Sequence, residues 1–263
     1  MKTTADHHIL VVIYNITVEQ SKTIDSLTRN SSLINNSTVH IWDNSPLPNR
    51  FDVKKIQGST SLRIKYIHTP ENTSLSVIYN KIAKETPEKS YLTILDQDTD
   101  LPSEYFSELA ALQEKKHPLI LPIVLCRNTI VSPGRRIYSH GMLFHEIASG
   151  AHSSKNLLAI NSGMSISHEV FSKFNYDSRL RFYGTDTYFM RMYEKFFSHA
   201  YVMSTRIDHS LAEMEDRSSD WRRSHLQEKI RTFGIIFNNS PLESMLSRLH
   251  CLILRIKYSL DKK

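Results

Sequence analysis

The sequence predicts an α/β protein in which a mainly parallel central sheet is covered by helices on both faces. Strand-like runs alternate with helical runs four times in the first half of the chain, which is the order of βαβ units. Residues 91–95 are apolar, strand-forming and too few for a helix, so we expect them to form a central strand. Asp96, Asp98 and Asp100 follow directly, at the strand end where open α/β sheets bind ligands.

The other expected elements follow along the chain. Strands are expected at residues 9–14, 39–46, 62–67, 119–125, 157–160 and 201–207. Helices are expected at residues 18–33, 75–85, 103–116, 168–174 and 186–197. The strand at 157–160 is expected to return to the central sheet, and residues 127–156 are expected to be rich in loops.

The three acids after the central strand are crowded together. Neighbouring carboxylates repel one another, and a hard divalent cation with oxygen ligands relieves that repulsion best. The alternative is that the acids only solvate a strand end and open the next helix. That alternative suits Asp100, because residues 101–104 (LPSE) resemble a helix start. For Asp96 and Asp98 we favour binding of a metal or a diphosphate.

Composition bounds the class of protein. With 263 residues, 40% of them hydrophobic and 23% charged, the chain suits one large globular α/β domain with a small appendage. A formal net charge of +6 predicts a polyanionic neighbour, which is a nucleic acid, a phosphate-bearing substrate or a membrane surface. The seven glycines form neither GxGxxG nor GxxxxGK[ST], which argues against a glycine-rich dinucleotide site and a P-loop.

Targeting signals and cysteines point to the compartment. Cys126 and Cys251 make no disulfide framework, which is typical of a reducing compartment. Neither a secretory leader nor an apolar run long enough to cross a bilayer is visible in the sequence. We therefore expect a cytoplasmic protein, and peripheral attachment to the inner face of the plasma membrane stays open.

The composition changes near the C-terminus, so we divide the chain into a domain at 1–215 and a helical extension at 216–263. From residue 220 onward, nine basic residues stand against four acids. A helix is expected to start at Ser240 and Pro241, with one wide apolar face. That face is formed by Leu242, Met245, Leu246, Leu249, Leu252, Ile253, Ile256 and Leu260. Such a face usually packs on the domain as core, whereas a basic amphipathic helix can also lie on an anionic bilayer.

Several motifs follow one another in a known order, from residue 8 to about residue 210. They are VVIYN at 11–15, WDNS at 42–45, NTSLSVIYN at 72–80, LDQDT at 95–99, NSGM at 161–164 and GTD at 184–186. In this order the chain resembles family 2 inverting glycosyltransferases, which have the GT-A fold and bind nucleotide sugars. The LDQDT form looks most like the rhamnosyltransferase-like branch, which acts in the synthesis of bacterial surface polysaccharides such as O-antigen and capsule.

The resemblance implies a set of donor-binding residues. Tyr14, Asn15 and Asp43 would hold the base, since a carboxylate can accept the N3–H that uracil and thymine both offer. Asn72 and Asn80 would flank the nucleotide of the UDP- or dTDP-sugar. We favour the base-binding role for Asp43, but two alternatives stay open, because Asp43 also suits a turn and Asn80 can serve only to anchor a loop.

A metal site is also implied. Asp96 would bind the ribose or support the metal, Asp98 would coordinate Mn²⁺ or Mg²⁺, and His209 would add a metal or diphosphate contact. A histidine ligand would favour Mn²⁺ over Mg²⁺. The alternative for His209 is a structural role at a strand end.

The remaining roles concern the acceptor. Asp186 would be the catalytic base that takes the proton of the acceptor hydroxyl, although an aspartate there can also cap its helix. Ser162 and Gly163 would contact the acceptor, which we expect to be a saccharide on a polyprenyl diphosphate carrier. Two other functions are compatible with parts of the sequence. A nucleotidyltransferase also uses paired acids on a metal, and a nucleic-acid-binding protein would suit the positive net charge. The basic residues lack interleaved aromatic side chains, so no nucleic acid partner is expected.

Overall fold

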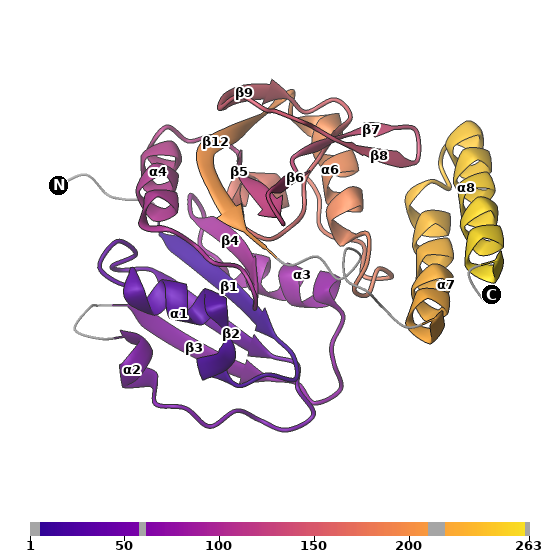
Figure 1. Cartoon of the computed structure of the whole chain (residues 1–263). Helices are drawn as coiled ribbons and strands as arrows, with labels where there is room; N and C mark the ends of the chain where they lie inside the picture. Colours follow the sequence, from indigo (N-terminus) through magenta and orange to yellow (C-terminus); the bar gives the residue numbers. More distant parts are fainter. Residues whose placement is uncertain (1–5, 58–61, 210–218, 261–263) are drawn as a thin grey trace.

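The computed structural model describes residues 6–57, 62–209 and 219–260, and its centre is a nine-stranded sheet between two layers of helices (Figure 1). The strand order is β3-β2-β1-β4-β11-β5-β12-β9, and β6 pairs with β5. The strands are β1 (His7–Ile13), β2 (Thr38–Asp43), β3 (Arg63–His68), β4 (Tyr91–Asp96), β5 (Leu119–Cys126), β6 (Thr129–Ser132), β9 (Gly150–Ser153), β11 (Met164–Ser167) and β12 (His199–Asp208).

The sheet is mainly parallel, as the sequence predicts. Strands β3, β2, β1 and β4 pair in parallel, and so do β5 and β12. The antiparallel strand β11 joins these two groups, because it pairs with both β4 and β5. The carboxyl ends of β1, β2, β4 and β12 therefore lie at one edge of the sheet.

Helices cover both faces of the sheet, and successive residues of β1 show why. Ile9, Val11 and Ile13 pack into the core on one face, whereas Leu10 and Val12 pack into the core on the other. The first face is covered by η1 (Val18–Gln20), α1 (Lys22–Arg29), α2 (Val53–Gln57) and α4 (Ser103–Glu114). The second is covered by α3 (Leu75–Glu85), α5 (His168–Phe171) and α6 (Thr185–Phe196).

A second, three-stranded sheet corrects two of the predictions. It consists of β7 (Gly134–Ile137), β8 (His140–Leu143) and β10 (Leu157–Leu158). The region at 127–156 therefore contains four short strands rather than mostly loops. The prediction that residues 157–160 return to the central sheet is wrong, because β10 pairs with β7 and β11 occupies the central place. Leu157 and Ala159 bury their side chains in the core on the second face without joining the sheet.

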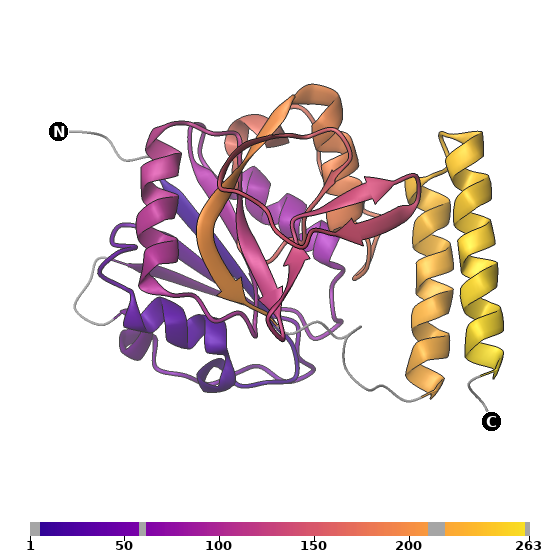
Figure 2. The ribbon, with the colours of Figure 1, turned by 45° about the horizontal axis from the view of Figure 1, so that its top comes forward.

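Two helices, α7 (Ser219–Ile236) and α8 (Pro241–Leu260), lie side by side at one end of the molecule (Figures 1 and 2). We call this pair the C-terminal hairpin. The start of α8 is where the sequence predicts it, and α7 falls within the predicted helical extension, although the sequence analysis gives no bounds for it. The predicted boundary between residues 215 and 216 lies outside the described residues. Among the described helices, none has the length and apolarity that crossing a membrane requires.

The apolar face of α8 points outward. Its side chains are between 49% and 60% exposed at Leu242, Met245, Leu249, Leu252, Ile253 and Ile256. The buried residues of α8, Ser247 and Cys251, lie on another face of the helix. The interpretation of the apolar face as domain core is therefore wrong for these six side chains. Their spacing predicts amphipathicity correctly, but it carries no information about which face meets α7.

Candidate functional site

Two strand ends bring acids and a histidine together at the carboxyl edge of the sheet. Asp96 ends β4, Asp98 lies in the turn that follows, and His209 comes directly after β12. The His209 Nδ1 atom lies 3.2 Å from Asp98 Oδ1, and its Nε2 atom lies 3.6 Å from Asp96 Oδ2. The amide of Asp100 donates to the carbonyl of Asp208 at 3.1 Å, which ties the two loops together. We call residues 96–99 together with His209 the carboxylate turn.

Hydroxyl groups from distant parts of the chain hold the carboxylate turn. The Thr23 hydroxyl, at the start of α1, donates to the Asp96 carbonyl and accepts from the amide of Thr99 at 3.0 Å. The Ser162 hydroxyl accepts from the amide of Asp96 at 3.2 Å and lies 2.6 Å from Thr99 Oγ1. Thr99 Oγ1 in turn lies 3.1 Å from His209 Nδ1. Every residue of this network is fixed by at least two contacts, which preorganises the turn.

Burial and charge shift the pKa values inside the turn. Burial and the neighbouring Asp98 carboxylate raise the pKa of Asp96, although His209 and Ser162 oppose that rise. Burial lowers the pKa of His209, but the hydrogen bond to Asp98 and the two carboxylates outweigh it, so the net pKa is raised. The two carboxylates therefore favour the protonated imidazole, and this cationic form would offset their mutual repulsion.

The same three side chains have the donor types that a divalent ion requires. Two carboxylates and an imidazole suit Mn²⁺ better than Mg²⁺. In the part of the chain that the structure describes, no three His, Cys, Asp or Glu side chains are already arranged around a common metal position. Each ring nitrogen of His209 lies within 3.6 Å of a carboxylate oxygen. A bound ion would take over the neutralisation that the imidazole provides here.

Asp186 lies in the first turn of α6. The N-cap of this helix is Gly184, whose φ of 71° is left-handed, so Asp186 is the second helical residue rather than the cap. Its Oδ1 atom accepts a hydrogen bond from the amide of Thr187 at 2.6 Å. Asp186 is thus not the N-cap residue, although its carboxylate satisfies one free amide of the first turn and lies at the positive end of the helix dipole.

Asn161 and two buried tyrosines link Asp186 to the carboxylate turn. Asn161 donates to Thr185 Oγ1 on α6 at 3.0 Å and accepts from the Tyr176 hydroxyl at 3.0 Å. Tyr79 packs against Tyr176 with 5.0 Å between the ring centres, and burial, followed by the charge of Asp96, raises the pKa of Tyr79 well above 10. Sequence reasoning missed these tyrosines, because they come from separate segments and only the fold brings them together.

Ser162 and Gly163, the predicted acceptor contacts, are both enclosed by protein. Ser162 is fully buried on the carboxylate turn. Gly163 has a φ of 83°, and a Cβ atom there would collide with Pro122 and Ile207. The segment from Asn161 to Gly163 therefore joins the turn to α6. Its contact with an acceptor stays a prediction.

The predicted base-binding residues lie at the ends of β1 and β2. Tyr14 is 42% exposed, and its amide donates to Gln97 Oε1 in the carboxylate turn at 2.7 Å. The amide of Asn15, a residue with a left-handed φ of 56°, donates to Ser45 Oγ at 2.9 Å. The first contact places Tyr14 beside the carboxylate turn, whereas the second joins Asn15 to the loop after β2.

Asp43 is buried and fully engaged by the protein. Its Oδ1 accepts from the amide of Ser45 at 2.9 Å, and its Oδ2 accepts from the Tyr66 hydroxyl at 2.6 Å and the Asn49 side chain at 2.7 Å. Burial raises the pKa of Asp43, but these hydrogen bonds outweigh it and leave the net pKa lowered. The turn-forming interpretation describes what the carboxylate does here, and recognition of a base stays a prediction.

Asn72 and Asn80 lie on either side of the start of α3. Asn80 uses its whole amide on the backbone of Tyr176, donating to the carbonyl at 2.8 Å and accepting from the N–H at 2.9 Å. It anchors that loop, as the alternative interpretation expected. Asn72 has a left-handed φ of 51° in the loop before α3. A nucleotide contact for either residue stays a prediction.

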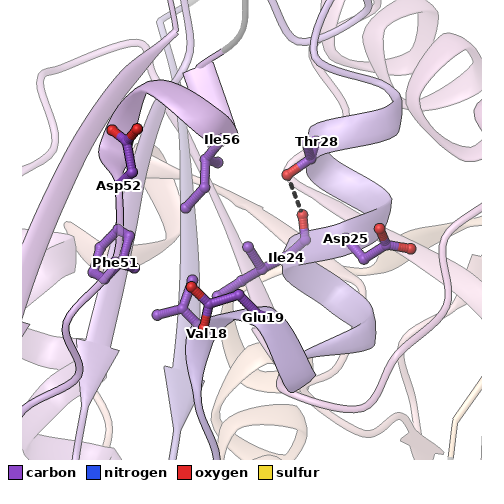
Figure 3. Close-up of a pocket in the computed structure, with 8 residues that line it drawn as sticks. All are labelled: Val18, Glu19, Ile24, Asp25, Thr28, Phe51, Asp52 and Ile56. Atoms are coloured by element: carbon purple, nitrogen blue, oxygen red, sulfur yellow. Dashed lines mark hydrogen bonds between the residues drawn. The ribbon is translucent and has the colours of Figure 1, made fainter.

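A cavity of about 190 Å³ lies between α1 and α2 (Figure 3). It contains none of the predicted site residues; its walls are Val18, Glu19, Ile24, Asp25, Thr28, Phe51, Asp52 and Ile56. Asp25 forms an ion pair with Arg29 at 3.0 Å, and Asp52 accepts from the amide of Lys54 at 2.9 Å. Two of the three acids of this cavity, Asp25 and Asp52, are thus engaged within the protein.

The similarity of this chain to known proteins is visible in its structure but not in its sequence. No known family profile matches the sequence, and no curated protein does either. Among solved structures, the chain is similar to GalNAc-T7 in complex with UDP, GalNAc and Mn²⁺, with a TM-score of 0.56 and 11% identity. The match covers 90% of this chain and 48% of that one, so the chain spans about half the length of GalNAc-T7.

Two further solved structures are similar to this chain over most of its length. TarS residues 1–349 from S. aureus has a TM-score of 0.54 and 12% identity, with 98% of this chain and 72% of that one covered. The mannosyltransferase PcManGT from Pyrobaculum calidifontis, in complex with GDP-Man and Mn²⁺, has a TM-score of 0.55 and 9% identity, with 95% and 70% covered. Likeness at such identities shows architecture, and the conclusion is that this chain has the GT-A fold.

Proposed function

We propose that this chain is a metal-dependent inverting glycosyltransferase. It would transfer a sugar from a UDP- or dTDP-sugar to a hydroxyl of a saccharide in surface polysaccharide synthesis. The observation that carries the proposal is the meeting of Asp96, Asp98 and His209. Through the adjacent residues Ser162 and Asn161 this group is linked to the first turn of α6, which holds Asp186. The similar structures support a nucleotide-sugar donor, since TarS was crystallised with UDP-GlcNAc and PcManGT with GDP-Man.

Asp98 and His209 would hold the ion, with Asp96 supporting it or binding the ribose. When bound, a divalent ion neutralises the charge that develops on the departing diphosphate. Mn²⁺ is the favoured ion because of the imidazole, and both GalNAc-T7 and PcManGT were crystallised with it. Thr23, Ser162 and Thr99 would keep the carboxylates in place while the ion enters.

Asp186 would act as the general base. As the acceptor oxygen forms its bond to the anomeric carbon, Asp186 takes the hydroxyl proton and the bond from that carbon to the diphosphate breaks. Attack from the face opposite the leaving group inverts the configuration and releases a nucleoside diphosphate. Asn161 would hold α6 beside the carboxylate turn, because it bonds Thr185 while its neighbour Ser162 bonds the turn.

A lipid-linked acceptor would explain the outward apolar face of α8. This face is half exposed, and the exposed side chains of Arg248 and Arg255 lie at one margin of it, which is the pattern of a helix lying on an anionic bilayer. Leu249→Glu is expected to weaken binding to phosphatidylglycerol vesicles about tenfold or more without loss of folding. Equal vesicle binding by the variant would contradict the proposed contact, and a concentration-dependent dimer lost on substitution would assign the face to a second copy.

The proposed activity is tested by nucleoside diphosphate release from a panel of nucleotide sugars with Mn²⁺. The assay is repeated with EDTA and with Asp98→Ala, and calorimetry of donor binding accompanies it, because some transferases need the acceptor. Turnover of one donor that both treatments abolish supports the proposal. Release of inorganic diphosphate would instead show a nucleotidyltransferase, and the lack of both turnover and donor binding would refute the transferase.

A further inference from the structure

The C-terminal hairpin is joined to the rest of the molecule by a cluster of buried ion pairs. Glu243, in the first turn of α8, accepts from Arg191 Nη1 at 2.9 Å and Nη2 at 2.8 Å, which is a bidentate pair. It also accepts from Arg136 Nη1 at 2.7 Å. Arg136 reaches Glu194 at 2.7 Å with its other nitrogen. One carboxylate thus connects α8 with α6 and with β7.

These ion pairs are shielded from water, so they constrain the elements that they join. The side chain of Arg136 is 7% exposed, and those of Arg191 and Glu243 are each 15% exposed. Removing one partner of a buried pair leaves an uncompensated charge, which costs far more than the loss of a surface pair. Glu243 is also the only acid between residues 241 and 260, so no neighbour in α8 can replace it.

The hairpin also covers the end of α6 where Asp186 lies. A Cβ atom on Gly184 would collide with the Thr232 side chain and press on that of Ile236, so side chains of α7 pack directly on the backbone at the N-cap of α6. Leu180, before this cap, packs in an apolar cluster with Ile236 and Phe237. Figures 1 and 2 show α7 beside α6, and the β7–β8 hairpin extending toward the two C-terminal helices.

Arg191 combines these contacts, since its guanidinium lies 4.8 Å from the centre of the Phe237 ring and also forms the ion pair with Glu243. On the opposite side, α6 is held by the core, where Phe189, Met190 and Tyr193 are fully buried. The helix that holds Asp186 is therefore fixed between the core of the domain and the C-terminal hairpin, and Glu243 makes the polar half of the second attachment.

We infer that Glu243 is a positioning residue: through Arg191 it holds α6 in the place from which Asp186 meets the acceptor, and through Arg136 it fixes β7 against the same helix. The role given to Asp186 rests on the proposed function, whereas the hold on α6 rests on the contacts alone. A displacement of about 1 Å in a catalytic group costs on the order of a hundredfold in rate, so a loosened α6 affects transfer strongly. Donor binding at the carboxylate turn does not pass through Glu243.

The test compares Glu243→Gln with Glu228→Gln in the full-length protein. Both variants remove one negative charge from the hairpin. Glu228 has as its ion-pair partner Arg231, at 3.3 Å within the same helix, so it serves as the matched control. Three quantities are measured: hydrogen–deuterium exchange of the α6 amides, kcat of transfer, and Kd for the nucleoside diphosphate. Arg191→Gln and the double variant Arg191→Gln/Glu243→Gln complete a double-mutant cycle, which measures the coupling between the two residues.

For Glu243→Gln we expect exchange of the α6 amides to rise about tenfold, kcat to fall about ten- to a hundredfold, and Kd to stay within about twofold. The double variant should lose little more than either single variant, and Glu228→Gln should match the wild type. Equal exchange and kcat in the two glutamine variants would overturn the inference. So would a loss of donor binding in step with kcat, because that would indicate general unfolding. If no nucleotide sugar is turned over, the proposed function fails, and the exchange of α6 still decides whether Glu243 holds it.

Discussion

The carboxylate turn and the C-terminal hairpin both sit at the margin of the central sheet, yet they are held in different ways. The turn is fixed by a dense network of hydroxyl and backbone groups from β4, α1, β12 and the segment at 161–163. The hairpin is fixed by a small apolar cluster, the ion pairs of Glu243, and single contacts such as the Tyr183–His225 ring pair and the bond from Arg231 to the Arg179 carbonyl. In the proposed function, this difference separates a turn that is rigid enough for chemistry from a hairpin that would act on that chemistry through a single helix, α6.

The largest effect should follow from removing an acid of the turn. Asp98→Ala is expected to reduce turnover of the nucleotide sugar by at least about a thousandfold, because the diphosphate loses its counterion. Asp100→Asn is the matched control in the same sequence motif, since its carboxylate is committed to Ser26 and Arg29 at 2.9 Å each. Comparable losses in the two variants would mean that the turn needs these acids only for its fold.

The first turn of α6 should matter for transfer but not for donor binding. Asp186→Asn keeps the size of the side chain and removes the base, so kcat of transfer should fall about a hundred- to a thousandfold. The Kd for the nucleoside diphosphate, measured by calorimetry, should not change. A variant with full transfer activity would assign the proton to another group and would separate α6 from the chemistry.

The contact between α6 and α7 can be weakened or left intact with a pair of glycine substitutions. Gly184→Ala forces a left-handed residue to carry a Cβ atom against Thr232, so the free energy of unfolding should fall by about 2–3 kcal/mol. Gly234→Ala meets no atom within 4 Å and should stabilise α7 by about 0.5–1 kcal/mol. Chemical denaturation of both variants measures the two changes, and the same sign in both would contradict the docking of the hairpin.

The smallest expected effect is on the free energy of unfolding at acidic pH. Burial raises the pKa of Glu243, but its contacts with Arg191 and Arg136 outweigh burial and leave the net pKa below the usual value. The folded protein therefore binds fewer protons at this group than the unfolded chain, and its contribution to stability is lost as the pH falls through the lowered pKa. Below about pH 4.5, the free energy of unfolding should decline more steeply for the wild type than for Glu243→Gln. Parallel curves would show that Glu243 adds no stability through its charge.

The two regions also differ in how far the sequence reveals them. The central strand and its acids are local signals, since an apolar run and the acids that end it are adjacent in the chain. The Thr23 hydroxyl lies 73 positions from Asp96, and no pattern near Thr23 marks it as a contact. The segment at 161–163 was expected to meet the acceptor, yet its partners are the turn on one side and α6 on the other.

For the C-terminal hairpin, the sequence predicts a helix but not how that helix packs. Helical spacing predicts α8 and its apolar face, but not the face that packs, because the packing depends on Glu243 meeting arginines that lie 52 and 107 positions earlier. The four short strands between residues 129 and 153 were missed because runs of four residues are too short to show a period. Tertiary pairing, rather than local propensity, decides their structure.

In the proposed function, the carboxylate turn binds a divalent ion for a nucleotide sugar. Its most direct test is a calorimetric titration of Mn²⁺ into the wild-type protein, Asp98→Asn and Asp100→Asn, each saturated with UDP and, in a second series, with dTDP. We expect one site in the wild type and in Asp100→Asn, with one of the two nucleotides, and at least about a tenfold loss of affinity in Asp98→Asn. Equal Mn²⁺ affinity in all three proteins, or no binding by the wild type with either nucleotide, would contradict the claim and leave His209 as the only cation of the turn.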